Sequence, residues 1–358
     1  MAETTAYIGL GSNLGDRKGN IDKALKMLAE AEQVELGRVS DIIETAALAS
    51  TTQPTYLNAV AELKTALSAE GLHKVLVDIE GSLGRVRREK WSPRTIDLDL
   101  LLFGGDVINR PGLTVPHAQM HFRSFVLKGL CQLDSELVHP VLKVPVRELE
   151  ARLNGGDFAP DPDKPQLVSI AGVIGVGKTT LARRLAERLD CKVQFEPYDT
   201  NPFLPQVYAG RKELALDSQL YFLTGRAQQL DAGLLERGRI YISDYVFNKE
   251  RIYARRLLDA QQLALYEQIY PPFAAKAAPP VLVIYMRDSA QGCLKRIHSR
   301  NRPYEQRIEL QLLQGLDDDY EQLFEHWKTC PVIRVSTSEA SDVDRLVHQV
   351  KCYTTVGG

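Results

Sequence analysis

Two carboxylates follow a dense run of basic side chains in the first half of the chain. Asp97 and Asp99 alternate with the apolar residues Ile96, Leu98 and Leu100, so a strand here carries both carboxylates on one face. The ten residues from 85 to 94 hold five cations: Arg85, Arg87, Arg88, Lys90 and Arg94. Paired carboxylates favour a hard cation such as Mg²⁺, and arginines bind phosphates through paired hydrogen bonds. The pattern predicts phosphoryl-type transfer from a magnesium-bound polyphosphate, with a solvated charged loop as the alternative.

A glycine-rich loop opens the second half. Residues 172–179 read Gly-Val-Ile-Gly-Val-Gly-Lys-Thr, which fits the pattern G-x-x-x-x-G-K-[ST] between an apolar strand and a helix. The backbone N–H groups of such a loop cradle phosphates at the start of the helix. Lys178 is expected to reach the β- and γ-phosphates, and the Thr179 hydroxyl to ligate Mg²⁺.

Further polar residues lie at spacings that suit a kinase site. Glu196 and Pro197 follow a further predicted strand. Gln219 and Arg226 are seven residues apart, which puts them on one face of a helix. Arg296 and Arg300 are one turn apart on a probable helix and are placed to close over bound ATP.

The elements that must position these residues form two different patterns. In the first half we expect strands near 6–10, 38–47, 58–66 and 96–103, and helices near 19–32, 69–82 and 123–133. In the second half we expect strands at 167–171, 239–243 and 280–286, and a helix at 178–189. The first pattern predicts an α/β or α+β sandwich, and the second a doubly wound three-layer domain with a parallel sheet.

A linker separates the two halves. Residues 154–166 contain three prolines, two glycines and three aspartates, a composition that builds neither a helix nor an inner strand. We therefore predict a first domain over 1–158, a linker over 159–166 and a second domain over 167–358. Each domain is long enough to bury a core of its own.

Composition excludes several other classes of protein. The 358 residues are 44% hydrophobic and 25% charged with a formal net charge of −2, which is globular and not basic enough for a non-specific nucleic-acid binder. No apolar run approaches 18 residues and the start lacks a secretory signal, so we expect a cytoplasmic protein without a membrane partner. The five cysteines are far apart and form no C-x-x-C pair, which argues against zinc and disulfides.

The basic and acidic segment of the first half carries a family resemblance. Residues 90–101, Lys-Trp-Ser-Pro-Arg-Thr-Ile-Asp-Leu-Asp-Leu-Leu, resemble the signature of the 6-hydroxymethyl-7,8-dihydropterin pyrophosphokinases of folate synthesis. Supporting segments at 7–14, 56–58 and 113–117 follow in the same order. The resemblance implies a ferredoxin-like fold over about residues 5–150. It also implies transfer of the pyrophosphate of ATP to the pterin hydroxymethyl group, which releases AMP.

The resemblance also implies roles for individual residues. Asp97 and Asp99 would hold two Mg²⁺ ions that bridge the ATP phosphates. The residues implied to contact phosphates are Arg85, Arg87, Arg94 and His117. Those implied to shape the pterin pocket are Thr45, Tyr56, Asn58, Trp91, Arg123 and Phe125. The sequence departs from the family where Ala46 replaces a usual proline and where Ser92 replaces a usual glycine or alanine.

The second half, over about residues 166–350, resembles the deoxynucleoside kinases. The resemblance rests on the phosphate loop, the Glu-Pro pair at 196–197 and the spacing of the polar residues that follow. It implies transfer of the γ-phosphate of ATP to a 5′-hydroxyl, releasing ADP, within a P-loop three-layer α/β/α kinase fold. Helix-paired dimers are common among such kinases, so a homodimer through this domain is a further expectation.

Site residues of the second half follow from this resemblance. Glu196 would be the general base, and Gln219 would pair with the edge of the base beside Arg226. Tyr208 and Glu305 would bind the 3′-hydroxyl. The residues implied to bind ATP and its phosphates are Gly172, Gly175, Gly177, Lys178, Thr179, Thr180, Arg296, Arg300 and Arg302. Thr179 and Asp244 would hold one Mg²⁺ ion.

One departure concerns a positive charge. Many related kinases carry an arginine directly after the acidic residue that ends the central strand, whereas Tyr245 follows Asp244 in this chain. Lys249 and Arg251 are the two candidates to supply the missing charge.

The sequence thus predicts a bifunctional, magnesium- and ATP-dependent transferase with small-molecule substrates. Two alternatives remain open at this stage. In the first alternative, which Ala46 and Ala47 motivate, the first half is a pterin- or nucleotide-binding module without catalytic activity. In the second alternative, the second half is a kinase for another small hydroxyl acceptor, such as a nucleoside monophosphate.

Overall fold

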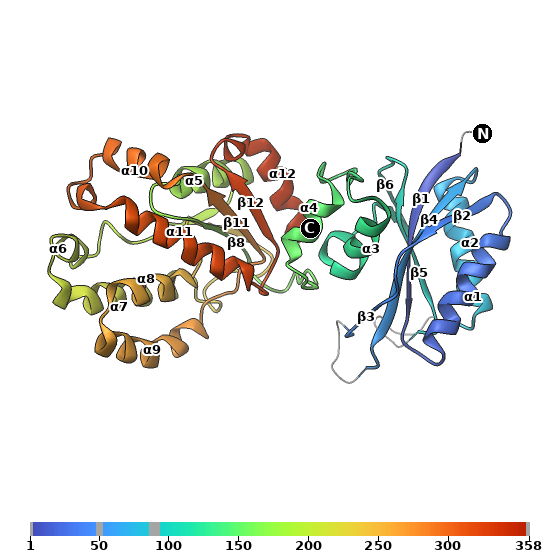
Figure 1. Cartoon of the computed structure of the whole chain (residues 1–358), viewed down its shortest axis with the longest axis horizontal. Coiled ribbons are helices and arrows are strands. Elements are labelled where there is room, and N and C mark those ends of the chain that lie inside the picture. Colours follow the sequence, from blue (N-terminus) through green and yellow to red (C-terminus); the bar gives the residue numbers. More distant parts are fainter. Residues whose placement is uncertain (1–2, 48–52, 86–93, 356–358) are drawn as a thin grey trace. The chain divides into compact units, whose positions relative to one another are not determined.

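The structure is a computed structural model of the chain and describes residues 3–47, 53–85 and 94–355. The chain divides into two compact units, Met1–Ala159 and Pro160–Gly358, and each is described by itself (Figure 1). In the part of the chain that the structure describes, no helix is long and apolar enough to cross a membrane.

The first unit is built on an antiparallel sheet with helices on both faces. Its strands are β1 (Thr4–Ser12), β2 (Val34–Val39), β3 (Ile43–Thr45), β4 (Tyr56–Thr65) and β5 (Asp97–Phe103). They lie in the order β2-β4-β1-β5, with β3 paired to β4. One face carries α1 (Arg17–Glu30) and α2 (Ala69–Ser82), and the other carries α3 (Ser124–Asp134) and α4 (Val146–Leu153) (Figure 1). The predicted α/β sandwich is confirmed.

Local sequence explains where the two long helices of this unit begin. The Asp16 carboxylate accepts a hydrogen bond from the N–H of Gly19 at the start of α1. The Ser68 hydroxyl accepts one from the N–H of Gly71 at the start of α2. These side chains satisfy N–H groups that have no partner within the helix. The apolar faces behind the caps, such as Ile21 of α1, are buried against the sheet.

The strand predicted near 38–47 is two strands, which is a difference from the sequence-based expectation. β2 ends at Val39 and β3 begins only at Ile43. The reason lies at Ser40, whose N–H donates to the carbonyl of Val60 and whose hydroxyl accepts from the N–H of Val60. The side chain of Ser40 thus takes a place in the ladder and interrupts the regular pairing.

β5 shows how the sheet exposes its acidic pair. Leu98 and Leu100 are buried in the core, whereas Asp97 and Asp99 are on the opposite face, as the alternation predicted. On the neighbouring strand β1, Gly11 lies opposite Asp97 and Gly9 lies opposite Asp99. Because glycine has no side chain, β1 leaves space on the sheet surface beside the two carboxylates.

A short hairpin and a single helical turn complete the first unit. The hairpin is formed by β6 (Ile108–Arg110) and β7 (Leu113–Val115), and the 3₁₀ turn η1 (Met120–Phe122) leads into α3. α4 ends at Leu153, and Asn154 follows in the left-handed conformation with φ 48°. Phe158, in the proline- and glycine-rich segment 154–166, belongs to this unit, because its N–H donates to the carbonyl of Phe122 at 2.9 Å.

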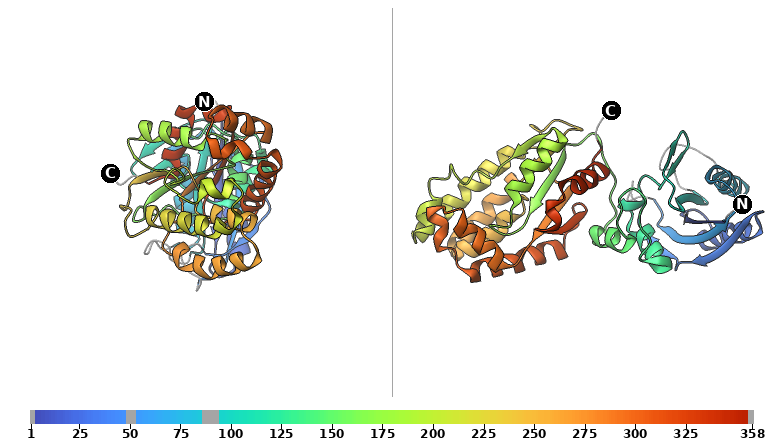
Figure 2. Two further views of the ribbon diagram at one scale, coloured as in Figure 1. Left: turned by 90° about the vertical axis from the view of Figure 1, so that its left-hand side faces the viewer. Right: turned by 90° about the horizontal axis from the view of Figure 1, so that it is seen from above.

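The second unit is a parallel sheet with helices on both sides. Its strands are β8 (Gln166–Ala171), β9 (Lys192–Gln194), β10 (Ile240–Ser243), β11 (Leu282–Arg287) and β12 (Val332–Ser336), in the order β12-β11-β8-β10-β9. On one side lie α5 (Lys178–Leu189) and α12 (Val343–Tyr353), and on the other α7 (Ala215–Gln229), α8 (Lys249–Leu257) and α9 (Ala260–Ala274) (Figures 1 and 2). The predicted three-layer parallel-sheet fold is confirmed.

The strand order places the ligand-binding edge of this sheet. The chain leaves β8, returns through β10 on one side and continues to β11 on the other. Such a reversal opens a crevice at the carboxyl ends of the strands. The elements around this end are α6 (Leu204–Tyr208), α10 (Ala290–Ser299), α11 (Leu310–Glu325) and the short turns η2 (Lys212–Leu214) and η3 (Pro303–Arg307). The turn η4 (Glu339–Ser341) precedes α12.

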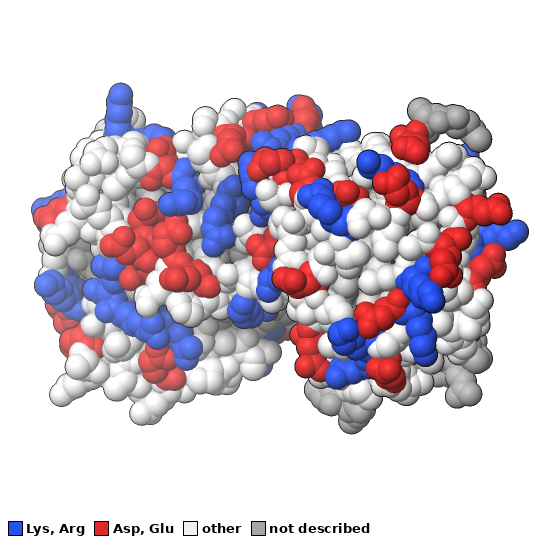
Figure 3. Space-filling view, turned by 45° about the vertical axis from the view of Figure 1, so that its right-hand side comes forward, with Lys and Arg blue, Asp and Glu red and all other residues white. Residues whose placement is uncertain are grey.

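Surface charge is mixed in both units. Figure 3 shows Lys and Arg beside Asp and Glu on the face that it presents. Several of these neighbours are ion pairs, such as Arg38 with Glu62 at 2.6 Å and Arg251 with Glu267 at 2.9 Å. A surface that binds nucleic acid without specificity would gather basic side chains on one face.

Asp157 generates a first testable prediction, because it caps α3 from 33 residues away. Its Oδ1 accepts hydrogen bonds from the N–H of Ser124 at 2.6 Å and from the Ser124 hydroxyl at 2.8 Å. Replacing Asp157 by Ala removes this cap, which stabilises a helix start by about 1 kcal/mol. We expect amide exchange in the first turn of α3 to become about fivefold faster, as measured by hydrogen-exchange mass spectrometry.

The matched control is Asp106→Ala, at an exposed aspartate between β5 and β6. It should leave exchange in α3 unchanged. Equal exchange rates in Asp157→Ala and the unmodified protein would contradict the assignment of Asp157 as a cap.

Candidate active sites

The first pocket lies on the face of the first unit that carries Asp97 and Asp99. Nine of the residues predicted for this site line it: Thr45, Tyr56, Asn58, Arg94, Asp97, Asp99, His117, Arg123 and Phe125. Arg85 reaches the site through an ion pair with Asp97 at 2.6 Å. Arg87, Trp91 and Ser92 lie outside the described residues.

Asp97 is held between two arginines. Its carboxylate pairs with Arg85 through Oδ1 and with Arg94 through Oδ2. Burial, followed by the nearby charge of Asp99, raises the pKa of Asp97, while the arginines act in the opposite direction. Two carboxylates that repel each other in a pocket gain from any further cation placed between them.

Asp99 faces the other end of the pocket. Its carboxylate is 3.5 Å from Nη1 of Arg123 and 4.0 Å from Nε2 of His117. Burial lowers the pKa of His117, so the ring favours its neutral form near neutral pH. A neutral imidazole can donate one hydrogen bond to a phosphate without adding charge.

Glu80 is a member of this site that the sequence analysis missed. It lies on α2, and its side chain, 4% exposed, pairs with Arg85. Its Oε1 also accepts the N–H of Leu98 at 2.7 Å, which ties the arginine to the start of β5. A signal was present, because Glu80 is a carboxylate on the same helix face as the apolar Leu76.

The end of the pocket near β3 is built from neutral groups. The amide of Asn58 donates to the hydroxyl of Thr45 at 2.8 Å, so its direction is fixed. A methyl group at Gly11 would lie 3.1 Å from the Asn58 carbonyl oxygen, which explains why glycine is used there. Tyr56 and Phe125 supply aromatic surface. A flat heterocycle with an amide edge suits these walls.

The two carboxylates of the first pocket suit a magnesium ion that takes its other ligands from water and substrate phosphates. Among the described residues, no group of three or more His, Cys, Asp or Glu side chains is arranged to hold a metal ion. Asp97 and Asp99 nevertheless offer carboxylate oxygens on one face of one strand. Mg²⁺ usually takes one or two carboxylates and completes its shell with water and substrate phosphates. The residues present fit an ion that arrives with ATP.

The second pocket lies at the carboxyl ends of β8, β9 and β10. Its lining includes the predicted residues Gly175, Gly177, Lys178, Thr179, Thr180, Glu196, Tyr208, Gln219, Arg226, Asp244, Arg296, Arg300, Arg302 and Glu305. Gly172 opens the loop with φ 137°. A Cβ there would lie 2.5 Å from the carbonyl oxygen of Met286, so only glycine lets the loop lie on β11.

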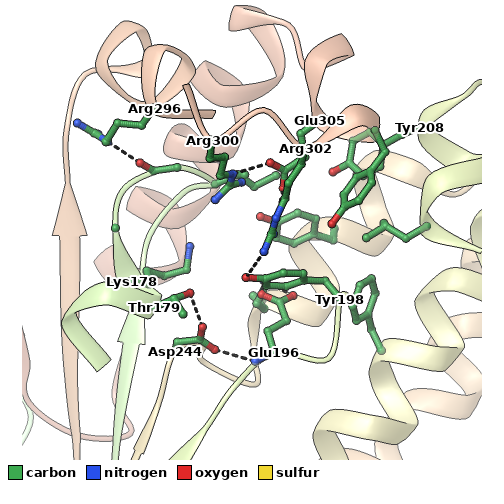
Figure 4. Close-up of a pocket in the computed structure, with 18 of the residues that line it drawn as sticks. Lys178, Thr179, Glu196, Tyr198, Tyr208, Asp244, Arg296, Arg300, Arg302 and Glu305 are labelled. Carbon is green, nitrogen blue, oxygen red and sulfur yellow. Dashed lines mark hydrogen bonds and ion pairs between the residues drawn. The ribbon is translucent and has the colours of Figure 1, made fainter. Parts of the chain in front are cut away.

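Lys178 and Thr179 lie at the start of α5, directly after the glycines of the phosphate loop (Figure 4). The Lys178 ammonium donates to the carbonyls of Gly172 at 2.8 Å and Val173 at 2.9 Å. Burial, followed by the charge of Lys249, lowers the pKa of Lys178 to about 8. The Thr179 hydroxyl donates to Oδ2 of Asp244 at 2.6 Å. The donor pair of Thr179 and Asp244 has the oxygen chemistry that suits one Mg²⁺ ion sharing phosphate ligands.

Asp244 joins the phosphate loop to Glu196. Its Oδ1 accepts the backbone N–H of Glu196 at 2.8 Å, while its Oδ2 accepts from Thr179 (Figure 4). Burial, followed by the charge of Glu196, raises the pKa of Asp244. The end of β10 therefore fixes both the helix start of α5 and the residues that follow β9.

Glu196 is held by two cations. Nζ of Lys249 is 2.8 Å from each of its carboxylate oxygens, and Arg226 pairs with Oε1. Burial alone would raise the pKa of Glu196, but Lys249 and Arg226 outweigh it, so the pKa lies well below its usual range. Glu196 is therefore ionised in the resting site.

Arg226 also anchors a second acid that the sequence analysis missed. Glu250 is fully buried, pairs with Arg226 and accepts the hydroxyl of Tyr266 at 2.6 Å. Beside them Gln219 is 2% exposed, and its Oε1 has no hydrogen-bond partner. The pocket thus presents an amide with one open acceptor next to a fixed guanidinium. No local pattern in the sequence marks Glu250, because its partners lie on α7 and α9.

The arginines of the predicted lid bind the protein itself in this structure. Arg296 donates to the carbonyl of Gly175 at 2.6 Å and pairs with Asp288 at 2.6 Å. Arg300 donates to Glu305 at 2.5 Å. Arg302 donates to the hydroxyl of Tyr198 at 3.1 Å (Figure 4). The lid therefore surrounds the phosphate loop with three guanidinium groups. The sequence analysis missed Tyr198.

The two 3′-hydroxyl candidates lie on the same side of the pocket (Figure 4). Burial, followed by the charge of Glu305, raises the pKa of Tyr208 above its usual range, which keeps its hydroxyl protonated as a donor. Glu305 is 6% exposed and is held by Arg300. A hydroxyl and a carboxylate together can donate to and accept from one substrate hydroxyl.

Comparisons with known proteins match the two units to two different families. Residues 7–135 match the family described as 7,8-dihydro-6-hydroxymethylpterin-pyrophosphokinase, and residues 168–354 match the family described as deoxynucleoside kinase. The chain is 42% identical over 136 residues to the 2-amino-4-hydroxy-6-hydroxymethyldihydropteridine pyrophosphokinase of Haemophilus influenzae, which covers 38% of this chain and 85% of that protein. It is 41% identical over 128 residues to that of Bacillus subtilis, covering 36% and 77% respectively.

Solved structures resemble the chain more distantly. The deoxyadenosine kinase from M. mycoides with bound dATP is 24% identical with a TM-score of 0.46, over 52% of this chain and 99% of that one. The same kinase with products is 25% identical with a TM-score of 0.45, over 52% and 96%. On its family matches, the chain belongs in its first unit to the 7,8-dihydro-6-hydroxymethylpterin-pyrophosphokinase family and in its second unit to the deoxynucleoside kinase family.

Proposed function

We propose that the chain is a bifunctional transferase with two ATP-dependent sites. The first unit transfers pyrophosphate from ATP to 6-hydroxymethyl-7,8-dihydropterin in folate synthesis, and the second phosphorylates the 5′-hydroxyl of a deoxynucleoside. The observation that carries the proposal is that each unit gathers its family's expected acids and cations into one pocket. We assign the two activities to residues 1–158 and 167–358, joined by the linker 159–166.

In the first site, the protein positions two substrates against an acidic strand. Asp97 and Asp99 are the residues that would hold two Mg²⁺ ions, which neutralise charge on the ATP phosphates when bound. Arg94 and Arg85, with Arg87 from the segment beside them, bind the phosphates, and His117 donates to them. Tyr56 and Phe125 provide aromatic surface for the pterin, and Trp91, outside the described residues, keeps its predicted role in this pocket. Asn58, Thr45 and Arg123 bind its polar edges.

The chemistry of the first site is a displacement at the β-phosphorus of ATP. The hydroxymethyl oxygen forms a bond to that phosphorus, and the bond from phosphorus to the oxygen shared with the α-phosphate breaks. AMP leaves with the electron pair, and the proton of the hydroxymethyl group is lost. The arginines and His117 stabilise the charge that moves onto the leaving group.

In the second site, Glu196 is the general base. It accepts the proton of the 5′-hydroxyl as the oxygen bonds to the γ-phosphorus and ADP departs. Lys178 and the three lid arginines stabilise the transferring phosphoryl group, while Gly172, Gly175, Gly177 and Thr180 form the phosphate cradle. Thr179 and Asp244 are the residues that would hold one Mg²⁺ ion. Gln219 and Arg226 bind the base, and Tyr208 and Glu305 bind the 3′-hydroxyl.

Two other properties stay predictions. We propose that the protein works in the cytoplasm with small-molecule substrates and without nucleic acid or membrane. A homodimer through the second unit is also expected. Because the proposed substrates are small molecules, both activities can be assayed by giving the purified protein Mg-ATP with either the dihydropterin or a deoxynucleoside.

Asp97 and Asp99 provide the test of the first site. We expect Asp97→Asn or Asp99→Asn to lower AMP formation from ATP and the dihydropterin at least about 100-fold, because a neutral amide cannot neutralise Mg²⁺. Nucleotide chromatography of the products measures this directly. Phosphorylation of a deoxynucleoside by the same chains is the matched control and should be unchanged. Full AMP formation in both variants would remove the two residues from the site, and its absence in the unmodified protein would favour a non-catalytic binding module.

Glu196 provides the test of the second site. We expect Glu196→Gln to lower phosphorylation of the best deoxynucleoside at least about tenfold, because the amide cannot accept the 5′-hydroxyl proton. The measurement is ADP and deoxynucleoside monophosphate formed from each of the four deoxynucleosides. AMP formation by the first unit is the internal control. Unchanged turnover would exclude Glu196 as the base, and turnover only of a nucleoside monophosphate would establish the other kinase class.

A further inference from the structure

The second pocket holds more buried charge than its motifs explain. Besides Glu305 and the three lid arginines, the charged residues Lys178, Glu196, Arg226, Asp244 and Lys249 line it, and Glu250 is buried against Arg226. The phosphate loop accounts for Lys178, and the base-binding end accounts for Arg226. Lys249 has no place in either motif, although its side chain is only 4% exposed.

Lys249 occupies a position that disfavours a positive charge. It is buried, and burial is the foremost cause that lowers the pKa of its ammonium group. It is also the first residue of α8, where the helix dipole presents its positive end. A lysine is rarely buried unless it is paired. The pairing that compensates these two costs is with Glu196, at 2.8 Å from Nζ to each carboxylate oxygen.

This pairing determines how Glu196 can meet a substrate. An ionised carboxylate offers about four acceptor positions. Lys249 uses two of them and Arg226 uses a third, while the backbone N–H of Glu196 is bound to Asp244. One acceptor position remains for a hydroxyl in the pocket. The carboxylate is thus fixed in its plane and in the direction from which it accepts a proton.

Neither Tyr245, which stands where related kinases carry an arginine, nor Arg251, the second candidate for the missing positive charge, makes a hydrogen bond or ion pair with Glu196 in the structure. Tyr245, which follows Asp244, is buried and directs its hydroxyl to Gln229 at 2.7 Å. Arg251 pairs with Glu267 at 2.9 Å and lies over the ring of Tyr270 at 4.6 Å. Lys249 is the one of the three that reaches Glu196.

We infer that Lys249 is a positioning residue for phosphoryl transfer, which holds the Glu196 carboxylate toward the 5′-hydroxyl and balances its charge beside Asp244. The inference rests on the proposed kinase function. In the step, the O–H bond of the 5′-hydroxyl breaks and its proton moves to Glu196. The oxygen bonds to the γ-phosphorus, and the bond to the bridging oxygen breaks with its electron pair on ADP. The positive charge of Lys249 then lies beside a neutral acid and the newly anionic product.

The first experiment compares Lys249→Met, Lys249→Arg and the control Lys276→Met, at an exposed lysine outside the pocket. With Mg-ATP and the best deoxynucleoside, we expect Lys249→Met to lower kcat at least about tenfold, with KM for ATP changed less than about threefold. Lys249→Arg should recover most of the loss, and Lys276→Met should behave as the unmodified protein. AMP formation by the first unit and the thermal midpoint report that each chain is folded.

The second experiment asks whether Lys249 acts through Glu196. In the Glu196→Gln background, adding Lys249→Met should cause little further loss of kcat, because the group that it positions is already absent. If the fold-losses of kcat in the two single variants instead multiply in the double variant, Lys249 acts on the substrate directly, which overturns the inference. So would a Lys249→Met chain with a lowered thermal midpoint and normal kcat, which is the result of a purely structural ion pair. If the unmodified protein phosphorylates none of the four deoxynucleosides, the proposed function itself fails and the inference fails with it.

Discussion

The structure depends on one constraint, which is that each pocket must hold like charges close together in a buried place. Carboxylates taken out of water are stable only when cations or hydrogen-bond donors replace the solvent. In the first unit Arg85 and Arg94 flank Asp97, and Arg123 lies beside Asp99. In the second unit Arg226 and Lys249 hold Glu196. Both pockets therefore balance their charges within the protein before ATP arrives.

The two sheets meet this constraint by different geometry. The antiparallel sheet presents Asp97 and Asp99 from one face of its edge strand β5, and glycines on the neighbouring strand β1 leave the space that a flat substrate needs. The parallel sheet instead collects Lys178, Glu196 and Asp244 at its carboxyl edge, although they follow three different strands. A strand face suits stacking on a planar ring, while a strand edge with a helix start suits a chain of phosphates.

Part of this arrangement is visible in the sequence because its spacing is local. The alternation around Asp97, the glycine loop before Lys178 and the seven-residue spacing of Gln219 and Arg226 each follow from the geometry of one element. Glu80, Glu250 and Asp157 act across elements, and their partners lie 5, 24 and 33 residues away. Even the shortest of these separations joins a helix to a loop. The helix-face position of Glu80 does not identify its partner, and no periodicity marks Glu250 or Asp157, so these contacts became evident only in the structure.

The two sites also differ in how they treat the attacking hydroxyl, and the charge distribution explains why. In the first pocket the proposed mechanism assigns both described carboxylates, Asp97 and Asp99, to metal ions, and both also pair with arginines. In the second pocket it assigns Asp244 to the metal and the loop, which leaves Glu196, with one acceptor position, as the proposed base. That free position exists because Lys249 and Arg226 occupy the others. A base of this kind is weak in the empty site, since its cations stabilise the ionised form. We expect it to gain strength when the phosphates of ATP enter, because nearby negative charge raises the pKa of a carboxylate, and this would couple proton transfer to the presence of the phosphoryl donor.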